Sequence, residues 1–232
     1  MIVSMKPPYK ITTHILLLIS SISEKLGVVN ANFLNKPSPQ LRKQNKIKTI
    51  YSSLNIEGNT LTQEQVTAII ENKRVFGPKK DILEVVNAIK VYDNMKGFEF
   101  TSVKSFLKAH GILMKGIVDG AGKFRNQGVG IYQGSKVAHI APPAENITSL
   151  MNDLFKYLKS KDELPLIKSC VFHYEMEFIH PFIDGNGRMG RLWQTVILMN
   201  EYPVFEYLPF ETLISQSQIE YYKALSKSDK TG

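Results

Sequence analysis

The sequence of 232 residues has little cysteine and lacks the short motifs of several common classes of site. Its single cysteine, Cys170, cannot form an internal disulfide, and a reducing cytoplasm is the simplest compartment for it. There is no C-x-x-C pair, no H-E-x-x-H sequence and no P-loop, which argues against a zinc site and against a Walker-type ATPase. Any chemistry must therefore come from other residues.

Long apolar runs are also missing. The run from His14 to Ile22 is too short to span a bilayer and has no small-residue cleavage site, so we predict neither a membrane span nor a signal peptide. We expect a buried helix there instead. We find no internal repeat, and a hydrophobic content of 43% is ordinary for a globular protein.

Acidic residues are fewer than basic ones, 21 against 29, which gives a net charge of +8. A basic surface can bind nucleic acid. The lysines, however, are scattered along the chain, and no recognition-helix or aromatic-platform motif accompanies them. We therefore disfavour nucleic acid as a partner.

The segment from residue 180 to residue 191, H-P-F-I-D-G-N-G-R-M-G-R, gathers groups that phosphate chemistry uses. Apolar spacing predicts a helix over 165–179, with Cys170 in its apolar stripe, and a second helix that begins near Gly185. The first helix should end before His180, because a residue that precedes proline is pushed out of the helical region. The expected order is helix, tight loop, helix.

The start of the second helix is suited to anions. Its first N–H groups, around Gly185, Asn186 and Gly187, lack partners inside the helix and point at whatever lies before them. Arg188 and Arg191 project from one side of the helix, and arginine forks match phosphate oxygens. These residues predict a site for a polyphosphate.

Two further residues supply chemistry next to that site. Asp184 offers a hard oxygen ligand, which suits Mg²⁺ shared with substrate phosphates. His180 is the natural general base, since the unperturbed pKa of histidine lies near neutrality.

The same segment resembles the signature of the Fic family, H-x-F-x-[D/E]-G-N-G-R-x-x-R, at every specified position. The resemblance implies a mainly α-helical Fic-type bundle with a small β-hairpin flap. It also implies an enzyme that transfers AMP from ATP, with Mg²⁺, to a Tyr, Thr or Ser hydroxyl of a target protein. In that scheme His180 deprotonates the hydroxyl, Asp184 holds Mg²⁺, Arg188 and the glycine loop cradle the phosphates, Arg191 reaches the γ-phosphate, and Phe182 packs inward. A phosphate-transferring branch carries a lysine where this chain has Gly187, so nucleotide transfer is favoured.

A second motif lies at the end of a helix predicted over about 46–57. Glu57 stands at the C-terminus of that helix, where the dipole disfavours an anion, and Gly58 reads as the helix stop. Thr62 and Gln65 have the spacing of a capping box that opens the next helix. The stretch from Ser53 to Gly58 is similar to the inhibitory motif [S/T]-x-x-x-E-[G/N] of Fic proteins. The resemblance implies that Glu57 binds Arg191 and occupies the space of the γ-phosphate.

Residues 128–143 give the strongest strand signal, with a turn at 133–135. An exposed hairpin edge can pair with an extended peptide, and this stretch resembles the Fic flap, on which a protein substrate docks. Residues 211–226 form a further helical run in which Tyr221 and Tyr222 resemble the family's nucleobase pocket, so that one of them stacks on adenine or both serve helix packing. His173 we expect to be a packed histidine with one hydrogen bond.

We divide the chain into a helical N-terminal region, 1–100, which carries the inhibitory helix, and a Fic catalytic core, 101–232. A linker is expected over 35–40. Family members usually continue past residue 232 with at least one more helix, so we expect a C-terminally truncated chain. Two alternatives stay open: the same fold transferring another nucleotide or removing AMP, and a non-catalytic module that binds nucleic acid or protein. The oligomeric state, including a homo-oligomer, stays open as well.

Overall fold

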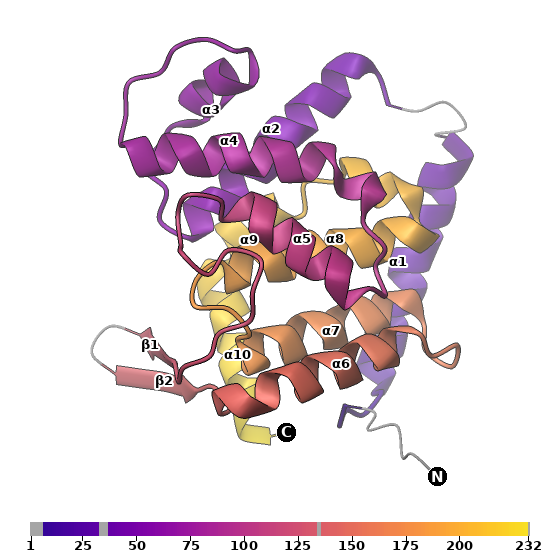
Figure 1. Ribbon diagram of the computed structural model, residues 1–232. Coiled ribbons are helices and arrows are strands. Elements are labelled where there is room, and N and C mark those ends of the chain that lie inside the picture. The colour runs from indigo at the N-terminus through magenta and orange to yellow at the C-terminus, as the bar shows by residue number, and fades with distance from the viewer. Residues whose placement is uncertain (1–6, 33–36, 134–135, 232) are drawn as a thin grey trace.

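The computed structural model describes residues 7–32, 37–133 and 136–231, and most of them lie in helices (Figure 1). The elements in chain order are α1 (Thr13–Asn32), α2 (Pro39–Ile56), α3 (Gln63–Ile70), α4 (Lys79–Asp93), η1 (Met95–Gly97), α5 (Val103–Leu113), β1 (Gly130–Gln133), β2 (Lys136–Ile140), η2 (Ala144–Asn146), α6 (Ile147–Leu158), α7 (Pro165–Ile179), α8 (Asn186–Glu201), η3 (Pro203–Tyr207), α9 (Glu211–Gln216) and α10 (Gln218–Thr231).

The centre of the molecule is the pair of helices α7 and α8, which pack extensively on each other. Trp193 of α8 is fully buried, and the ring of Phe106 from α5 meets it edge-on at a centroid distance of 5.0 Å. Phe155 of α6 and Phe172 of α7 complete this aromatic cluster. Burial of each such ring stabilises the fold by on the order of 2 kcal/mol. The loop between α7 and α8 is therefore attached to two firmly packed helices.

The N-terminal helices share this core. Leu54 of α2, Val66 of α3 and Val85 of α4 are buried in the same cluster as Phe106 and Trp193. Figure 1 shows α4 passing in front of α2 and lying above α5. The segment from Ser53 to Gly58 at the end of α2 therefore lies beside α8, where α2 and α8 are in contact.

Local signals set the ends of the elements near the site. Thr62 and Gln65 form the predicted capping box of α3. Gly58 follows α2 with a left-handed φ of 86°, as its place after the helix predicts. Helix α7 ends at Ile179, also as predicted, and the next residue, His180, is left-handed with a φ of 50°.

Four expectations about the helices are wrong. The run from His14 to Ile22 is helical but exposed, since Leu17 is 64% exposed, and among the residues of α1 whose burial is described only Leu26 belongs to the core. Cys170 is exposed, because the buried face of α7 runs instead through Phe172 and Met176.

The expected run over 211–226 breaks at Ser217, so that α9 packs on α2 while α10 reaches β2. Of the expected linker, Pro39 and Gln40 already belong to α2, which Ser38 caps, and residues 35 and 36 lie outside the described part of the chain.

Strands β1 and β2 pair antiparallel, with an irregularity in register between Ile131 and Tyr132. They project from one side of the helical body (Figure 1). The predicted turn includes residues 134 and 135, which lie outside the described residues.

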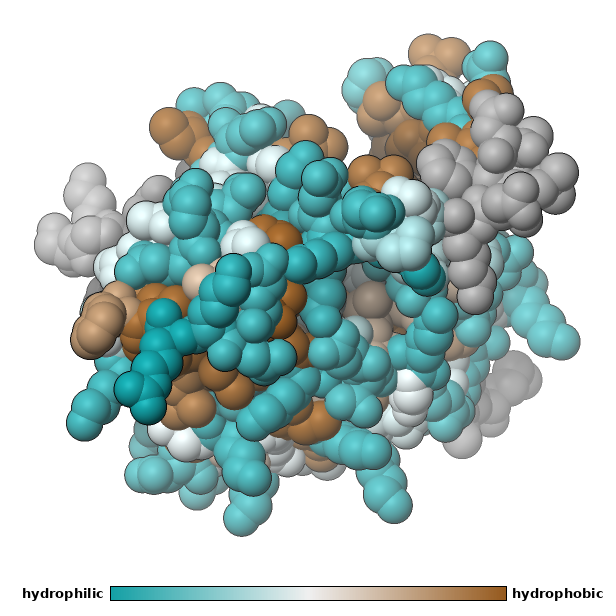
Figure 2. Space-filling view, turned by 90° about the horizontal axis from the view of Figure 1, so that it is seen from above, coloured by the Kyte–Doolittle hydropathy of each residue, from teal (hydrophilic) through white to brown (hydrophobic). Residues whose placement is uncertain are grey.

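The face seen from above carries hydrophilic side chains over most of its area, with smaller apolar groups between them (Figure 2). Among the described residues, none of the helices combines the length and the apolar character needed to cross a membrane.

Candidate active site

The loop between α7 and α8 is locked by its own residues. Asn186 accepts a hydrogen bond from the N–H of Phe182 and donates one to the carbonyl of the same residue, both at 2.9 Å. Phe182 is fully buried and stacks on His110 with a centroid distance of 3.6 Å. Gly185 has a φ of 88°, and a Cβ there would lie 2.7 Å from the sulfur of Met114, so glycine is required.

His110 supports the same loop from α5. Its Nδ1 accepts the N–H of Gly122 at 2.8 Å, so in the neutral ring Nε2 carries the proton and donates to the carbonyl of Asp184 at 3.0 Å. Burial lowers the pKa of His110 to about 4, which keeps the ring neutral near pH 7. The backbone of Asp184 is thereby held in place by a side chain of α5.

The position of His180 follows from backbone contacts. Its Nδ1 faces the carbonyl of Glu177 at 3.3 Å, and since a carbonyl only accepts, the lone pair of the neutral ring lies on Nε2. The carbonyl of His180 accepts from the buried guanidinium of Arg125 at 2.8 Å. Arg125 also binds the carbonyls of Gln127 and Pro142, which flank the strand pair. The backbone of His180 and the two ends of the strand pair are thus held by one side chain, that of Arg125.

Arg191 is fully buried and contacts Ser53 and Glu57 at the end of α2. Its Nη2 lies 2.8 Å from Oε1 of Glu57 and 2.9 Å from the carbonyl of Ser53, while its Nε lies 3.2 Å from Oγ of Ser53. Burial alone would lower the pKa of Arg191, but the charge of Glu57 raises it overall. The structure therefore brings the three residues of the predicted inhibitory contact together.

The Glu57 carboxylate fills the space beside the glycine turn. A Cβ at Gly187 would collide with Oε1 of Glu57 and lie 3.1 Å from Nη1 of Arg191. Glycine at this position is therefore what lets the carboxylate approach the start of α8. An anion bound there and Glu57 would compete for the same guanidinium.

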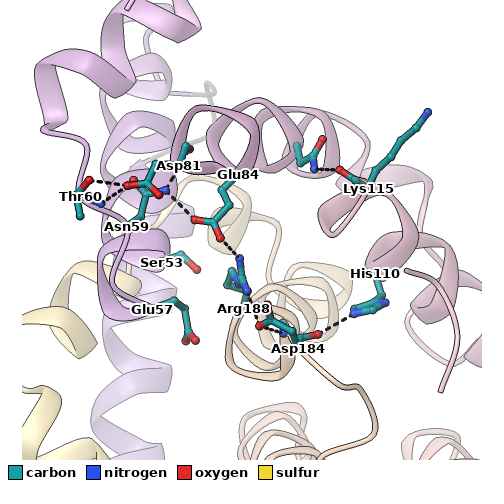
Figure 3. Close-up of polar contacts among 12 residues, drawn as sticks. Ser53, Glu57, Asn59, Thr60, Asp81, Glu84, His110, Lys115, Asp184 and Arg188 are labelled. Carbon is teal, nitrogen blue, oxygen red and sulfur yellow. Dashed lines mark hydrogen bonds and ion pairs between the residues drawn. The ribbon is translucent and has the colours of Figure 1, made fainter. Parts of the chain in front are cut away.

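Arg188, one turn earlier, has different partners (Figure 3). Its Nη1 donates to Oε1 of Glu84 at 2.9 Å, and its Nη2 donates to Oδ1 of Asp184 at 2.8 Å. The side chains of Arg188 and Glu84 are 5% and 7% exposed. The predicted phosphate ligand is thus held between two carboxylates.

Asp184 has the chemistry of a magnesium ligand. Within the described residues, both hydrogen bonds to its carboxylate, from Gly185 N–H and from Arg188, end on Oδ1, and the side chain is 42% exposed. No group of three or more His, Cys, Asp or Glu side chains in that part of the chain could hold a metal. A single exposed carboxylate fits Mg²⁺, which is commonly bound by one or two carboxylates together with substrate phosphates and water.

Buried titratable groups line the side of the site toward α10. Nε2 of His173 lies 2.7 Å from the hydroxyl of Tyr221, the single hydrogen bond expected for it. Burial raises the pKa of Glu177 to about 7 and lowers that of His173 to about 4. The hydroxyl of Tyr221 is thus engaged by His173 inside the protein. Tyr222, whose ring lies 5.1 Å from that of Tyr221, is 41% exposed.

The structure assembles the predicted loop, Glu57 and the two arginines around the start of α8. The side chain of Asn186, in contrast, is used on the backbone of Phe182, so only its N–H is left for a phosphate. Glu84 and Arg125 had not been identified as site residues. Each is buried although charged. No local motif predicts a role for Glu84, whereas Arg125 lies just before the stretch that resembles the Fic flap.

The comparisons agree on one family. The pattern of the Fic/DOC family matches residues 100–198. A protein adenylyltransferase Fic of Nematostella vectensis is 29% identical over 221 residues, which are 89% of this chain and 48% of that protein. A protein of the same name from Aedes aegypti is 32% identical over 181 residues, 71% of this chain and 34% of that protein.

A solved structure extends the similarity to nearly the whole chain. The crystal structure of a Fic family protein from Desulfovibrio desulfuricans is 48% identical, with a TM-score of 0.91, over 97% of this chain and 70% of that one. The chain spans only about a third to a half of the length of the two curated relatives.

Proposed function

The chain belongs to the Fic/DOC family, and from this premise we propose that it transfers AMP from ATP to a hydroxyl of a target protein. The observation that carries the proposal is the loop itself. It carries the first N–H groups of α8, the exposed carboxylate of Asp184 and the imidazole of His180 on one short turn between two helices. The names of the two curated relatives support the same reaction.

Binding of ATP uses the charge at the start of α8. The phosphates lie against the N–H groups of Asn186 and Gly187, where the helix dipole favours anions. Mg²⁺, when bound at Asp184, neutralises phosphate charge and orients the leaving group. The side chain of Tyr222 is exposed and available to stack on the base, whereas the hydroxyl of Tyr221 is engaged by His173.

The transfer step needs a base in line with the α-phosphorus. Nε2 of His180 takes the proton from the target hydroxyl as its oxygen attacks the α-phosphorus, and pyrophosphate leaves. The new phosphoester joins AMP to the target. The strand pair 130–140 serves as a flap that aligns the target segment, and Arg125 ties its root to His180.

Glu57 acts as a brake in this proposal. Its carboxylate, 2.8 Å from the Arg191 guanidinium, occupies the space that the γ-phosphate needs. ATP then binds in an unproductive pose until Glu57 leaves. Ser53 strengthens the brake through two contacts to the same arginine.

The proposal is tested by labelling Glu57→Gly with ATP that carries the label at the α- or at the γ-phosphate. We expect protein-bound label from the α position only, and none after His180→Ala is added, since a general base contributes about 10²–10⁴-fold. Label from the γ position would assign phosphate transfer instead. Turnover with other α-labelled nucleotides, or release of AMP from modified protein, would assign the alternative reactions, and binding without turnover a non-catalytic module.

A further inference from the structure

We propose that Glu84 is a positioning residue, which acts through Arg188 to aim the Asp184 carboxylate at the cation and to keep the Arg188 guanidinium away from the phosphates. This inference rests on the proposed function of the site. Glu84 belongs to α4, outside the signature, and its carboxylate accepts hydrogen bonds from Arg188 and Asn59 (Figure 3).

The contacts define one chain of polar groups. Oε1 of Glu84 accepts from Arg188 at 2.9 Å, and the other end of the same guanidinium donates to Oδ1 of Asp184 at 2.8 Å. Oδ1 of Asp184 also accepts from the N–H of Gly185 at 2.6 Å. With Oδ1 held twice, Oδ2 is the oxygen left to face the cation. Groups behind a metal ligand orient it in this way in metal sites generally.

The buried position of Glu84 makes this arrangement stiff. Its second oxygen, Oε2, accepts from Nδ2 of Asn59 at 2.8 Å. Nδ2 of Asn59 is also 3.1 Å from the carbonyl of Asp81, one turn before Glu84 on α4. Both carboxylate oxygens are therefore used, and Arg188 has a fixed charged acceptor. Asn59 follows Glu57 by two residues, so the loop that ends the inhibitory helix is attached to the same chain.

The charges predict opposite effects on the two ligands. Two carboxylates and one guanidinium carry one net negative charge, which attracts a cation and repels a phosphate. Replacing Glu84 by a neutral residue removes that excess. It also frees one end of the Arg188 fork for phosphate oxygens. Cation binding should weaken while binding of ATP without a cation strengthens.

The experiment uses the full chain with Glu57→Gly, alone and combined with Glu84→Gln. Binding of an α,β-methylene ATP analogue is measured by calorimetry without divalent cation, and binding of Mn²⁺ to the complex by electron paramagnetic resonance. We expect Mn²⁺ affinity to fall about tenfold and cation-free nucleotide to bind more tightly. Asp93→Asn, on the same helix and with the same change of charge but with an exposed side chain, is the matched control and should change neither affinity by more than about twofold.

The outcomes separate this inference from the proposed function. If the parent binds nucleotide but Glu84→Gln behaves like Asp93→Asn, or weakens both ligands together, the role of Glu84 is wrong and the function stands. If no variant binds the nucleotide, both are overturned. Glu84→Asp keeps the charge, so it should retain Mn²⁺ affinity within about threefold, even if Glu84→Gln does not fold.

Discussion

The two arginines of the signature lie one turn apart on α8 and are both buried, yet their surroundings differ. Arg191 meets Glu57, which caps the end of α2 and whose side chain is 26% exposed. Arg188 meets Glu84, which lies within α4 and is 7% exposed. Glu84 has a second hydrogen-bond partner in Asn59.

Because of this difference, the Glu57–Arg191 contact can open to solvent, whereas the Glu84–Arg188 contact is a permanent part of the packed interior. A partly exposed carboxylate at a helix end can exchange its partner for water when it leaves. A buried carboxylate cannot leave without losing its charge compensation. We therefore expect the contact between Glu57 and Arg191 to open more readily than the contact between Glu84 and Arg188.

The largest expected effect is the loss of stability on breaking the buried pair of Arg188 and Glu84. Arg188→Met leaves the buried charge of Glu84 without its cation, and we expect a loss of stability of about 3–5 kcal/mol. Urea unfolding measures it. Adding Glu84→Gln should recover more than half of the loss, because the stranded charge is then gone. A double variant that is less stable than Arg188→Met would mean that the two side chains are not coupled as described.

The next effect concerns Glu177, which lies beside Arg191. Its pKa is raised to about 7, so the stability tied to its neutral form is present below its ordinary pKa and is lost as the pH rises through 7. Glu177→Gln should therefore gain stability relative to the parent by about 2 kcal/mol between pH 5 and pH 8. Thermal unfolding of the two proteins across this range is the measurement. A constant difference in melting temperature would contradict the assignment.

Removing the proposed inhibitory carboxylate of Glu57 should change a smaller free energy but produce a measurable change in reaction rate. Glu57→Gly should raise auto-modification at least tenfold, which corresponds to about 1.4 kcal/mol. Label incorporation over time from α-labelled ATP reports it, with Glu71→Gly as a control at another partly exposed carboxylate, which is paired with Lys73. Equal rates for the parent and Glu57→Gly would remove the inhibitory role.

The smallest effect tests the support of the brake. Ser53→Ala removes one acceptor from Nε of Arg191, a hydrogen bond of 3.2 Å worth about 1 kcal/mol. Auto-modification should rise by no more than about fivefold, less than for Glu57→Gly. A rise above that of Glu57→Gly would show that the serine, and not the carboxylate, holds the inhibited state.

Local features of the site could be predicted from the sequence. The end of α7 before Pro181, the left-handed Gly58 and the capping box of Thr62 depend on residues a few positions apart. The contact of Glu57 with Arg191 was found because two short motifs of one family implied it. Neither helix periodicity nor charge would have paired residues 134 positions apart.

Tertiary features could not be predicted in the same way. Glu84 has the spacing of an ordinary carboxylate on an amphipathic helix, and its partner Arg188 is 104 residues away. Helix α1 is as rich in leucine as a buried helix, although several of its leucines are exposed. Only the packing of the other elements decides which helices are covered. On α7 the apolar residues form more than one stripe, so the sequence did not decide that Phe172 would face the core and Cys170 the solvent.

The most direct test of the account is a crystal structure of Glu57→Gly soaked with ATP and Mg²⁺. The account predicts phosphates on the first N–H groups of α8, the γ-phosphate against Arg191, and the α-phosphorus facing Nε2 of His180. Nucleotide bound elsewhere, an empty site beside Gly187, or the His180 ring turned away from the phosphates would contradict it.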